Sequence, residues 1–214
     1  MRCKTHTGPL GGFGSILVAL TVVLTGLLCT RVLGRPWPGR FPFETELASG
    51  VFLVARPQLR SPFFTESVVL VFSHDQRGAQ GLIINRPSQV RLTTVFPELG
   101  EERSDVFYFG GPVASNRMLL LLQSAQQRQG TQRVFEDIYV STSRQALTQI
   151  LTEPAAGERF RAYAGYAQWA PGQLEQEIVR GDWYVLAAEA TMLFTETPAA
   201  LWPALVRRRA LKWL

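Results

Sequence analysis

Cysteine and histidine are nearly missing from this chain, and their scarcity limits the chemistry that it can carry. Both cysteines, Cys3 and Cys29, lie near the N-terminus with His6, which leaves His74 as the other histidine. A zinc site built from the usual Cys and His ligands is therefore excluded from residues 45–214, as are disulfide and thiol chemistry. No acidic cluster indicates a magnesium site, and we expect neither a metal nor a cofactor.

Acidic residues are missing from residues 1–40, and the whole net charge of the protein therefore lies in this segment. Five of its 22 Lys and Arg residues lie there, namely Arg2, Lys4, Arg31, Arg35 and Arg40. The other 17 basic residues are balanced by 17 acidic ones. Binding to a nucleic-acid backbone needs an excess of Lys and Arg, and no helix-turn-helix pattern is present. We therefore expect no direct nucleic-acid binding by residues 45–214.

The same N-terminal segment lacks charge over a length that suits a membrane helix. Leu10–Thr30 holds 21 uncharged residues, which as a helix would cover roughly 30 Å of hydrocarbon. We predict a leader over 1–34 with a transmembrane helix at about 10–30, a linker rich in Pro and Gly over 35–44, and a domain over 45–214. A cleaved export signal, an organellar transit peptide and a start assigned too far upstream stay open as alternatives.

Basic residues on either side of this helix predict its orientation. Arg31, Arg35 and Arg40 follow it, whereas Arg2 and Lys4 precede it. The flank richer in Lys and Arg normally stays in the cytoplasm. We expect a single-pass protein of the inner (cytoplasmic) membrane with its domain facing the cytoplasm. If the leader is misassigned or cleaved, the alternative is a cytoplasmic or an exported protein.

From residue 45 onward, short apolar runs alternate with turn-forming residues, which is typical of strands. We predict strands at Val51–Ala55, Ser67–Ser73, Gly81–Asn85, Val106–Phe109, Arg117–Gln123, Asp137–Ser141, Arg159–Tyr166 and Asp182–Ala187. We predict helices at Ser143–Thr152, Gln173–Arg180 and Pro198–Leu214. Because strands come before helices rather than alternating with them, the pattern favours an α+β fold over a doubly wound sheet.

Four segments carry a more specific signal. They are Leu47–Ala55 with Phe63–Ser73, His74–Pro87, Gly110–Val113 with Arg117, and Gly165–Glu175 with Gly181 and Trp183. In this order and at this spacing they resemble the YqgE/AlgH family. The resemblance implies a compact α+β domain with a mixed, partly barrel-like β-sheet flanked by helices, here preceded by one N-terminal apolar helix. The family name reflects proposed transcriptional regulation of polysaccharide synthesis, without a known DNA-binding motif.

The chain departs from the family pattern in three places. Relatives usually look soluble and cytoplasmic, so the leader is extra. Gln168 stands where a small residue is common, and Leu122 stands where relatives often carry a histidine. Chemistry that the family shares through that histidine is therefore not expected here.

Polar or glycine residues follow several of the predicted strands, where loops commonly carry function. His74 opens such a loop, or it caps the strand. Asn85 and Arg86 offer donors to an anionic ligand, or they bond their own turn and a surface acid. Gly110 and Gly111 permit positive φ and a cradle of backbone N–H groups for an anion, or they form a tight structural turn.

Arg117, Trp169 and Gln173 complete the set of candidate ligand- or partner-binding residues. Arg117 follows the Gly-Gly turn, and the other two stand near the start of a predicted helix. A partly exposed Trp169 would suit a binding face, and plain packing is the alternative. We expect the Asn85 turn and the Gly110 turn to meet in space, with Trp169 at their border.

These observations favour a non-enzymatic regulatory or binding module, held at a membrane, that binds an unknown protein or a small anionic ligand. The alternative is a hydrolase or transferase that acts on a phosphorylated or acylated substrate through His74, Arg86 and the Gly-Gly turn. A serine hydrolase is disfavoured, because the sequence has no Gly-x-Ser-x-Gly nucleophile elbow.

Overall fold

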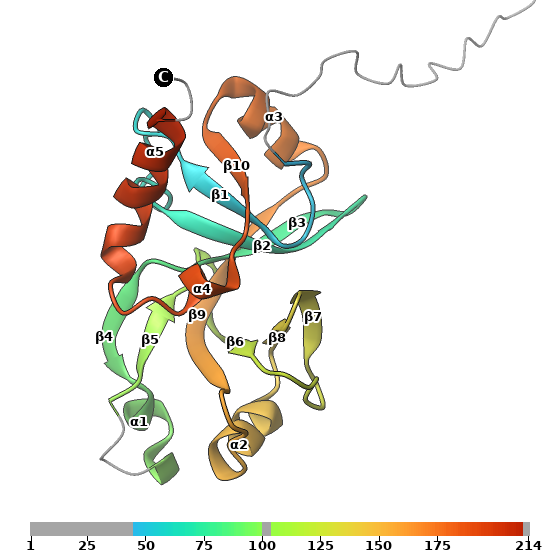
Figure 1. Ribbon diagram of the computed structural model, residues 1–214, viewed down its shortest axis with the longest axis vertical. Helices are drawn as coiled ribbons and strands as arrows, with labels where there is room; N and C mark the ends of the chain where they lie inside the picture. The colour runs from blue at the N-terminus through green and yellow to red at the C-terminus, as the bar shows by residue number, and fades with distance from the viewer. Residues whose placement is uncertain (1–44, 100–103, 212–214) are drawn as a thin grey trace, which may run out of the picture. The chain divides into compact units, whose positions relative to one another are not determined.

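The computed structural model describes residues 45–99 and 104–211 (Figure 1). The membrane helix predicted at 10–30 and the linker at 35–44 lie outside these residues. No helix within the described ranges has the length and apolar character needed to cross a membrane.

Strands dominate the described chain. They are β1 (Val51–Ala55), β2 (Val68–Asp75), β3 (Gly78–Ile83), β4 (Pro87–Arg91), β5 (Val106–Phe109), β6 (Val113–Gln123), β7 (Gln132–Phe135), β8 (Ile138–Ser141), β9 (Arg159–Trp169) and β10 (Trp183–Ala187). The helices are α1 (Leu92–Val95), α2 (Arg144–Thr152), α3 (Gln173–Arg180), α4 (Ala190–Leu193) and α5 (Leu201–Leu211), with 3₁₀ turns η1 (Pro97–Leu99) and η2 (Pro198–Ala200). Each predicted strand has a counterpart: β1 and β5 have the predicted bounds, and the ends of the others differ by a few residues.

The elements that the sequence did not predict are short. Strands β4 and β7 and helices α1 and α4 have four or five residues each. Nearly all of β4 is exposed, so no apolar run marks it in the sequence. The helix predicted to start at Pro198 begins instead as a 3₁₀ turn, and α5 starts at Leu201.

The strands form one open, mostly antiparallel sheet. Its order is β10-β1-β2-β3-β9-β6-β8-β7, and β4 and β5 branch from it beside β9. Strands β5 and β9 run parallel, which makes the sheet mixed. Over the described residues β10 and β7 end the path without pairing with each other. The predicted α+β fold with flanking helices is confirmed, but the sheet is not closed, so the partly barrel-like form is not.

Strand β9 belongs to two parts of the sheet. Its first residues pair with β6 and β5, and its last residues pair with β3. Gly165 lies between these parts with φ of 71°, a left-handed conformation that glycine adopts without steric cost. Because β9 changes neighbours at this point, the sheet branches there.

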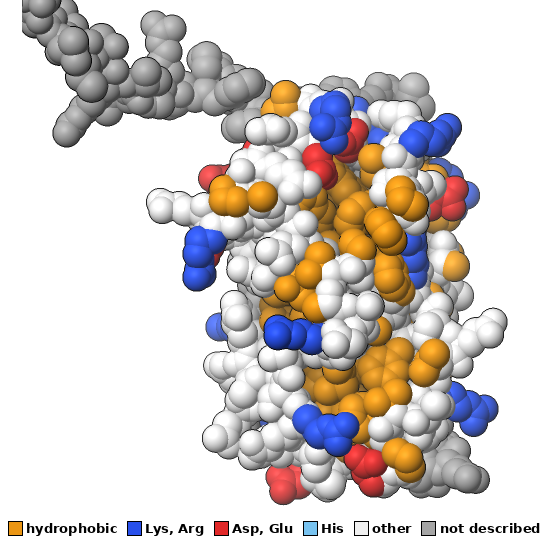
Figure 2. All heavy atoms as spheres, turned by 180° about the vertical axis from the view of Figure 1, so that it is seen from behind, with side chains coloured by type: hydrophobic (Ala, Val, Ile, Leu, Met, Phe, Trp, Pro, Cys, Tyr) orange, Lys and Arg blue, Asp and Glu red, His pale blue; other side chains and the backbone are white. Residues whose placement is uncertain are grey.

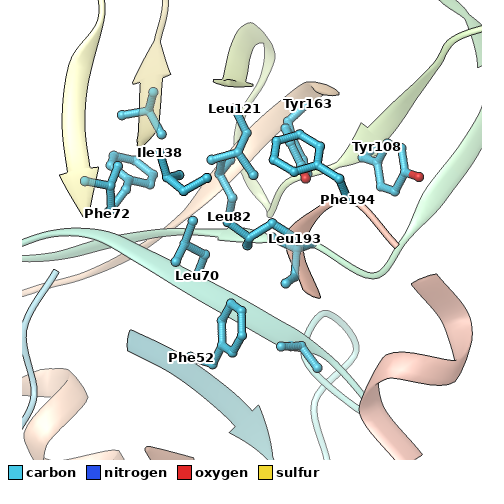
Figure 3. Close-up of a cluster of buried hydrophobic side chains, with 14 of the residues drawn as sticks. Phe52, Leu70, Phe72, Leu82, Tyr108, Leu121, Ile138, Tyr163, Leu193 and Phe194 are labelled. Carbon is cyan, nitrogen blue, oxygen red and sulfur yellow. The ribbon is translucent and has the colours of Figure 1, made fainter. Parts of the chain in front are cut away.

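Hydrophobic packing joins the two parts of the sheet. Every residue of β1 is buried, because β2 and β10 flank it and side chains cover both faces. Phe52, Leu70 and Leu82 from the first part lie in one buried cluster with Leu121 and Tyr163 from the second (Figure 3). Their burial removes apolar surface from water and fixes how the two parts meet.

The flanking helices begin and end at residues that favour such positions. The Ser143 side chain accepts a hydrogen bond from the Ala146 N–H at the start of α2. Helix α3 ends at Gly181, which has a left-handed conformation. Helix α5 buries Leu201 and Leu205 against the sheet.

Candidate functional site

Asn85 and Arg86 bind the protein's own backbone. The Asn85 side chain is buried, accepts a hydrogen bond from the Val68 N–H at 2.9 Å and donates one to the Glu66 carbonyl at 3.0 Å. The Arg86 guanidinium donates to the carbonyl of Phe63 at 2.6 Å and to that of Thr65 at 2.5 Å. These bonds hold the segment before β2 in place, so both residues act as a brace for it.

Burial affects the chemistry of this brace. The pKa of the Arg86 guanidinium is lowered from its ordinary value because desolvation disfavours its charge, and nearby Glu66 opposes that effect. An arginine stays charged across the physiological pH range even so. The two carbonyl groups occupy guanidinium N–H donors of Arg86, which the sequence analysis had proposed for binding an anion.

The Gly110 and Gly111 turn meets the Asn85 and Arg86 turn, as expected. The Phe109 N–H donates to the Arg86 carbonyl, and the Ile83 N–H to the Gly110 carbonyl, both at 2.9 Å. A Cβ atom on either glycine would lie within 3.0 Å of the β9 backbone around Gly165. The Gly110 N–H already donates to the Ala164 carbonyl. The glycines are therefore needed for close packing of this turn on β9.

His74 joins the end of β2 to helix α3. Its Nε2 atom lies 2.8 Å from Glu175 Oε1, and its side chain is 22% exposed. The neighbouring Asp75 pairs with Arg77, whose hydrogen bonds lower the pKa of that carboxyl below its ordinary value. The contact with Glu175 serves the docking of α3 on the sheet.

Trp169 does not offer an exposed face, since its side chain is 2% exposed. Its indole Nε1 donates to Glu177 Oε2 at 2.9 Å, and the indole of Trp183 donates to the same oxygen at 2.9 Å. Gln173 donates to the other oxygen of Glu177 at 3.0 Å. The packing alternative is therefore the one that the structure supports for Trp169. Sequence reasoning missed Glu177, although it stands one helical turn after Gln173.

Arg117 has a different setting, because β6 bulges where it lies. Val113 pairs with Tyr166 and Met118 with Ala164, so the residues between them loop out of the ladder. Ala114 takes up the bend with φ of 48°. We call residues 114–117 the β6 bulge.

The β6 bulge is fixed against β9 and presents polar side chains to solvent. A Cβ atom at Gly165 would clash with the Val113 carbonyl and lie 3.2 Å from Ser115 Cα, so the glycine lets the two chains touch. Ser115, Asn116 and Arg117 are all exposed. No hydrogen bond or ion pair holds Arg117 within the ranges that the structure describes. Sequence reasoning singled out Arg117 but not Ser115 or Asn116. The signal that could have indicated a turn there is the preceding run of Gly110, Gly111 and Pro112.

Arg117 stands between two hollows of the surface. The first, here called the polar hollow, has a volume of about 380 Å³ and lies between β2–β3 and β6–β8. Its lining consists of Phe72, Gln80, Arg117, Leu119, Gly130, Thr131, Gln132, Val140, Ser141, Thr142 and Tyr166. It combines an apolar floor with amides, hydroxyls and one cation.

The second hollow, here called the apolar groove, has a volume of about 370 Å³. Its lining consists of Ser88, Val90, Val95, Phe96, Phe107, Tyr108, Phe109, Ser115, Asn116, Arg117, Met118 and Ala164. Figure 2 shows one face of the molecule, on which hydrophobic side chains gather over a broad area with Lys and Arg side chains beside them.

Of the eight predicted site residues, Arg117 alone thus combines an exposed charge with a lining position in a hollow. Asn85, Arg86, Gly110 and Gly111 meet one another but are engaged in the fold. His74, Trp169 and Gln173 gather around helix α3 instead. Among the described residues, no group of three His, Cys, Asp or Glu side chains is placed to hold a metal ion.

Comparison with known proteins matches the domain to one family. The family model described as AlgH-like, DUF179, matches residues 52–213. A UPF0301 protein of Idiomarina loihiensis is 33% identical over 70% of this chain and 84% of its own length. A UPF0301 protein of Chromobacterium violaceum is 36% identical over 67% of this chain and 80% of its own length.

Solved structures agree with this match. The solution structure of the AlgH protein from Pseudomonas aeruginosa superposes with a TM-score of 0.64 at 30% identity, over 76% of this chain and 88% of that one. A crystal structure of a Corynebacterium diphtheriae protein gives a TM-score of 0.67 at 29% identity, over 77% of this chain and 88% of that one. The resemblance that the four sequence segments suggested is confirmed, and the chain belongs to the AlgH-like (UPF0301) family.

Proposed function

We propose that this protein is a regulatory binding module that takes a small anionic ligand at the β6 bulge, with Arg117 as the counter-charge. The setting of Arg117 carries the proposal: its guanidinium is exposed and takes part in no hydrogen bond or ion pair among the described residues, yet its backbone is fixed by the contact with Gly165. The fixed backbone removes the cost of ordering the main chain on binding, and the guanidinium presents a planar fork of donors.

Three other arginines near the sheet are already engaged. Arg86 bonds two carbonyls, and Arg128 pairs with Glu158. Arg161 donates to the carbonyls of Leu193 and Thr195. Their donors serve the fold, whereas those of Arg117 are available to a ligand.

The polar hollow beside Arg117 supports a small ligand. Its volume of about 380 Å³ falls within the range of about 300–1,000 Å³ that small-molecule sites occupy. Gln80 and Gln132 line it with Tyr166, so amide and hydroxyl groups surround the position where the anion would meet Arg117. The apolar floor of Phe72 and Leu119 would contact the remainder of the ligand.

Calorimetric titration of the full-length protein with phosphoserine and with serine tests the proposal. We expect phosphoserine to bind at least about tenfold more tightly, since charge-assisted hydrogen bonds contribute about 1.5–3 kcal/mol. Arg117→Gln should weaken the binding of phosphoserine by a similar factor. Arg207→Gln is the matched control, because Arg207 is an exposed arginine on α5. Equal affinity of Arg117→Gln and the unaltered protein for phosphoserine would refute the assignment of Arg117.

The proposal extends to the leader, for which the sequence is the support. Residues 10–30 are proposed to form a single membrane helix, with the domain on the cytoplasmic side because Arg31, Arg35 and Arg40 follow the span. Protease treatment of sealed spheroplasts that carry a C-terminal tag should leave the tag intact. Digestion of the tag while the membrane stays sealed would place the domain outside.

A further inference from the structure

The apolar groove exposes hydrophobic side chains to solvent. Val90 and Val95 line it and are 48% and 47% exposed. Phe107, Phe109 and Met118 line it as well. Exposed apolar side chains that gather in one hollow commonly mark a binding surface.

Polar side chains are a minority in the lining of the groove. Ser115, Asn116 and Arg117 of the β6 bulge stand together in the lining, which contains no acidic residue. Arg117 is thus the charged group of the groove, and it is the residue that the groove shares with the polar hollow. A mostly apolar hollow with one cationic side chain is complementary to an anion with an apolar tail.

The walls of the groove are held in place before any ligand arrives. The rings of Phe96 and Phe107 lie 6.4 Å apart, and the Arg144 guanidinium covers the Phe96 ring at 4.7 Å. A preformed hollow costs little ordering on binding.

The edge of β4 favours an acyl chain over a peptide as the occupant. The Val90 N–H donates to the hydroxyl of Ser88 at 3.1 Å, so it does not offer a donor to an added strand. A peptide bound in extended form needs main-chain partners of this kind. An acyl chain needs contact with apolar surface and nothing else along its length.

We propose that the apolar groove binds the aliphatic chain of an acyl carboxylate whose carboxylate pairs with Arg117. The proposal rests on the proposed function, because Arg117 holds the anionic group in both. The ligand class is an amphiphilic anion. Its charged group would bind at the β6 bulge and its aliphatic chain in the apolar groove.

The three methionines of the chain, Met1, Met118 and Met192, permit a site-resolved test. Full-length protein labelled with ¹³C at the methionine methyl groups is titrated with decanoate, and Met118→Leu assigns the groove signal. We expect the Met118 signal to shift saturably while that of Met192, which lines a different hollow, stays in place. Decanol lacks the charge and butyrate lacks the tail, so each should bind at least about tenfold more weakly than decanoate.

Variants separate the groove from the anion site. Val95→Asp should remove the decanoate response, and Val90→Asp provides a second variant should the first not fold. Val179→Asp is the matched control, because Val179 is an exposed valine on α3 with 56% exposure. Val95→Asp should leave phosphoserine binding intact, whereas Arg117→Gln should weaken both ligands.

Two results would overturn the inference. A decanoate response that survives both groove variants would place the acyl chain elsewhere, and the proposed anion site would stand on its phosphoserine result. A Met118 signal that shifts on dilution of the protein without decanoate would assign the groove to a second copy of the chain. If Arg117→Gln leaves phosphoserine binding unchanged but weakens decanoate binding, and Val95→Asp removes the decanoate response, the proposed function is refuted while the pairing of Arg117 with an acyl carboxylate stands.

Discussion

At the scale of single residues, Glu177 shows how one carboxylate stabilises two buried indoles. Trp169 and Trp183 are 2% and 1% exposed, and both donate to the same oxygen of Glu177. Their rings meet edge to face with centroids 6.1 Å apart. A buried N–H without an acceptor costs about 1–3 kcal/mol, so the carboxylate protects two groups at once.

Removal of this carboxylate should therefore be costly. We expect Glu177→Ala to lower the free energy of unfolding by roughly 2–4 kcal/mol, as measured by urea denaturation followed through tryptophan fluorescence. Glu175→Gln is the control, because Glu175 bonds His74 near the surface and its side chain is 41% exposed. Its change should stay near 0.5 kcal/mol, in the range of surface pairs. Equal losses in the two variants would show that the indoles do not depend on Glu177.

The roles of these residues were only partly predictable. The sequence marked Trp169 and Gln173, because aromatic and amide side chains near a helix start are visible in a linear pattern. It did not show that Trp183, on the next strand, shares an acceptor with Trp169. Such sharing depends on the packing of α3 between β9 and β10, which no local pattern encodes.

At the scale of elements, the Asn85–Arg86 pair orders the segment that leads into β2. The four carbonyl and N–H groups that it binds belong to residues 63–68. This segment also exposes Phe63, whose side chain is 45% exposed. The brace adds to the packing of Phe64 on Trp169 and Trp183, and its loss should favour local opening of the segment.

Arg86→Ala should loosen this segment more than it destabilises the whole domain. We expect faster amide hydrogen exchange in residues 61–67, measured by mass spectrometry, with a global loss of about 1–3 kcal/mol. Arg60→Ala is the matched control, because Arg60 bonds just the Pro57 carbonyl and is exposed. Exchange in this segment that does not change in Arg86→Ala would show that other contacts order it.

The β6 bulge explains why element boundaries were harder to predict than element types. The apolar run Arg117–Gln123 predicted a strand, and Leu119 to Leu122 are indeed buried. The strand begins earlier, at Val113, because Gly165 allows the bulge to pack against β9. That contact joins residues about fifty positions apart, so the residues of the bulge carried no local signal of their pairing.

At the scale of the whole molecule, the fold class followed from apolar periodicity, whereas the open form of the sheet did not. Runs such as Val51–Ala55 determine where strands form. The branch at β9 depends on which strands meet in space, and the family resemblance suggested partial closure. The core that joins the two parts, with Phe52 and Leu121 among its members, is made of residues far apart in the chain.

An ion pair joins Arg128, in the loop after β6, to Glu158, directly before β9. It makes the stability of the domain depend on pH. Arg128 donates to both oxygens of Glu158 at 2.8 Å, and the Glu158 side chain is 4% exposed. These bonds lower the pKa of Glu158 from 4.5 to about 2. Because the folded pKa is the lower one, the pair stabilises the fold fully above about pH 4.5 and loses that contribution as the pH falls toward 2.

The size of this contribution sets the last expectation. A pKa lowered from 4.5 to about 2 corresponds to about 3 kcal/mol of stability. Denaturation by urea between pH 5 and pH 2 should therefore show the protein losing about that much, and Glu158→Gln should lose less over the same interval because its amide does not titrate. Asp75→Asn is the control: its carboxyl is solvent-exposed beside Arg77, so screening keeps its share small and the slope should persist. A pH dependence that is the same in Glu158→Gln as in the unaltered protein would show that other carboxylates govern acid unfolding.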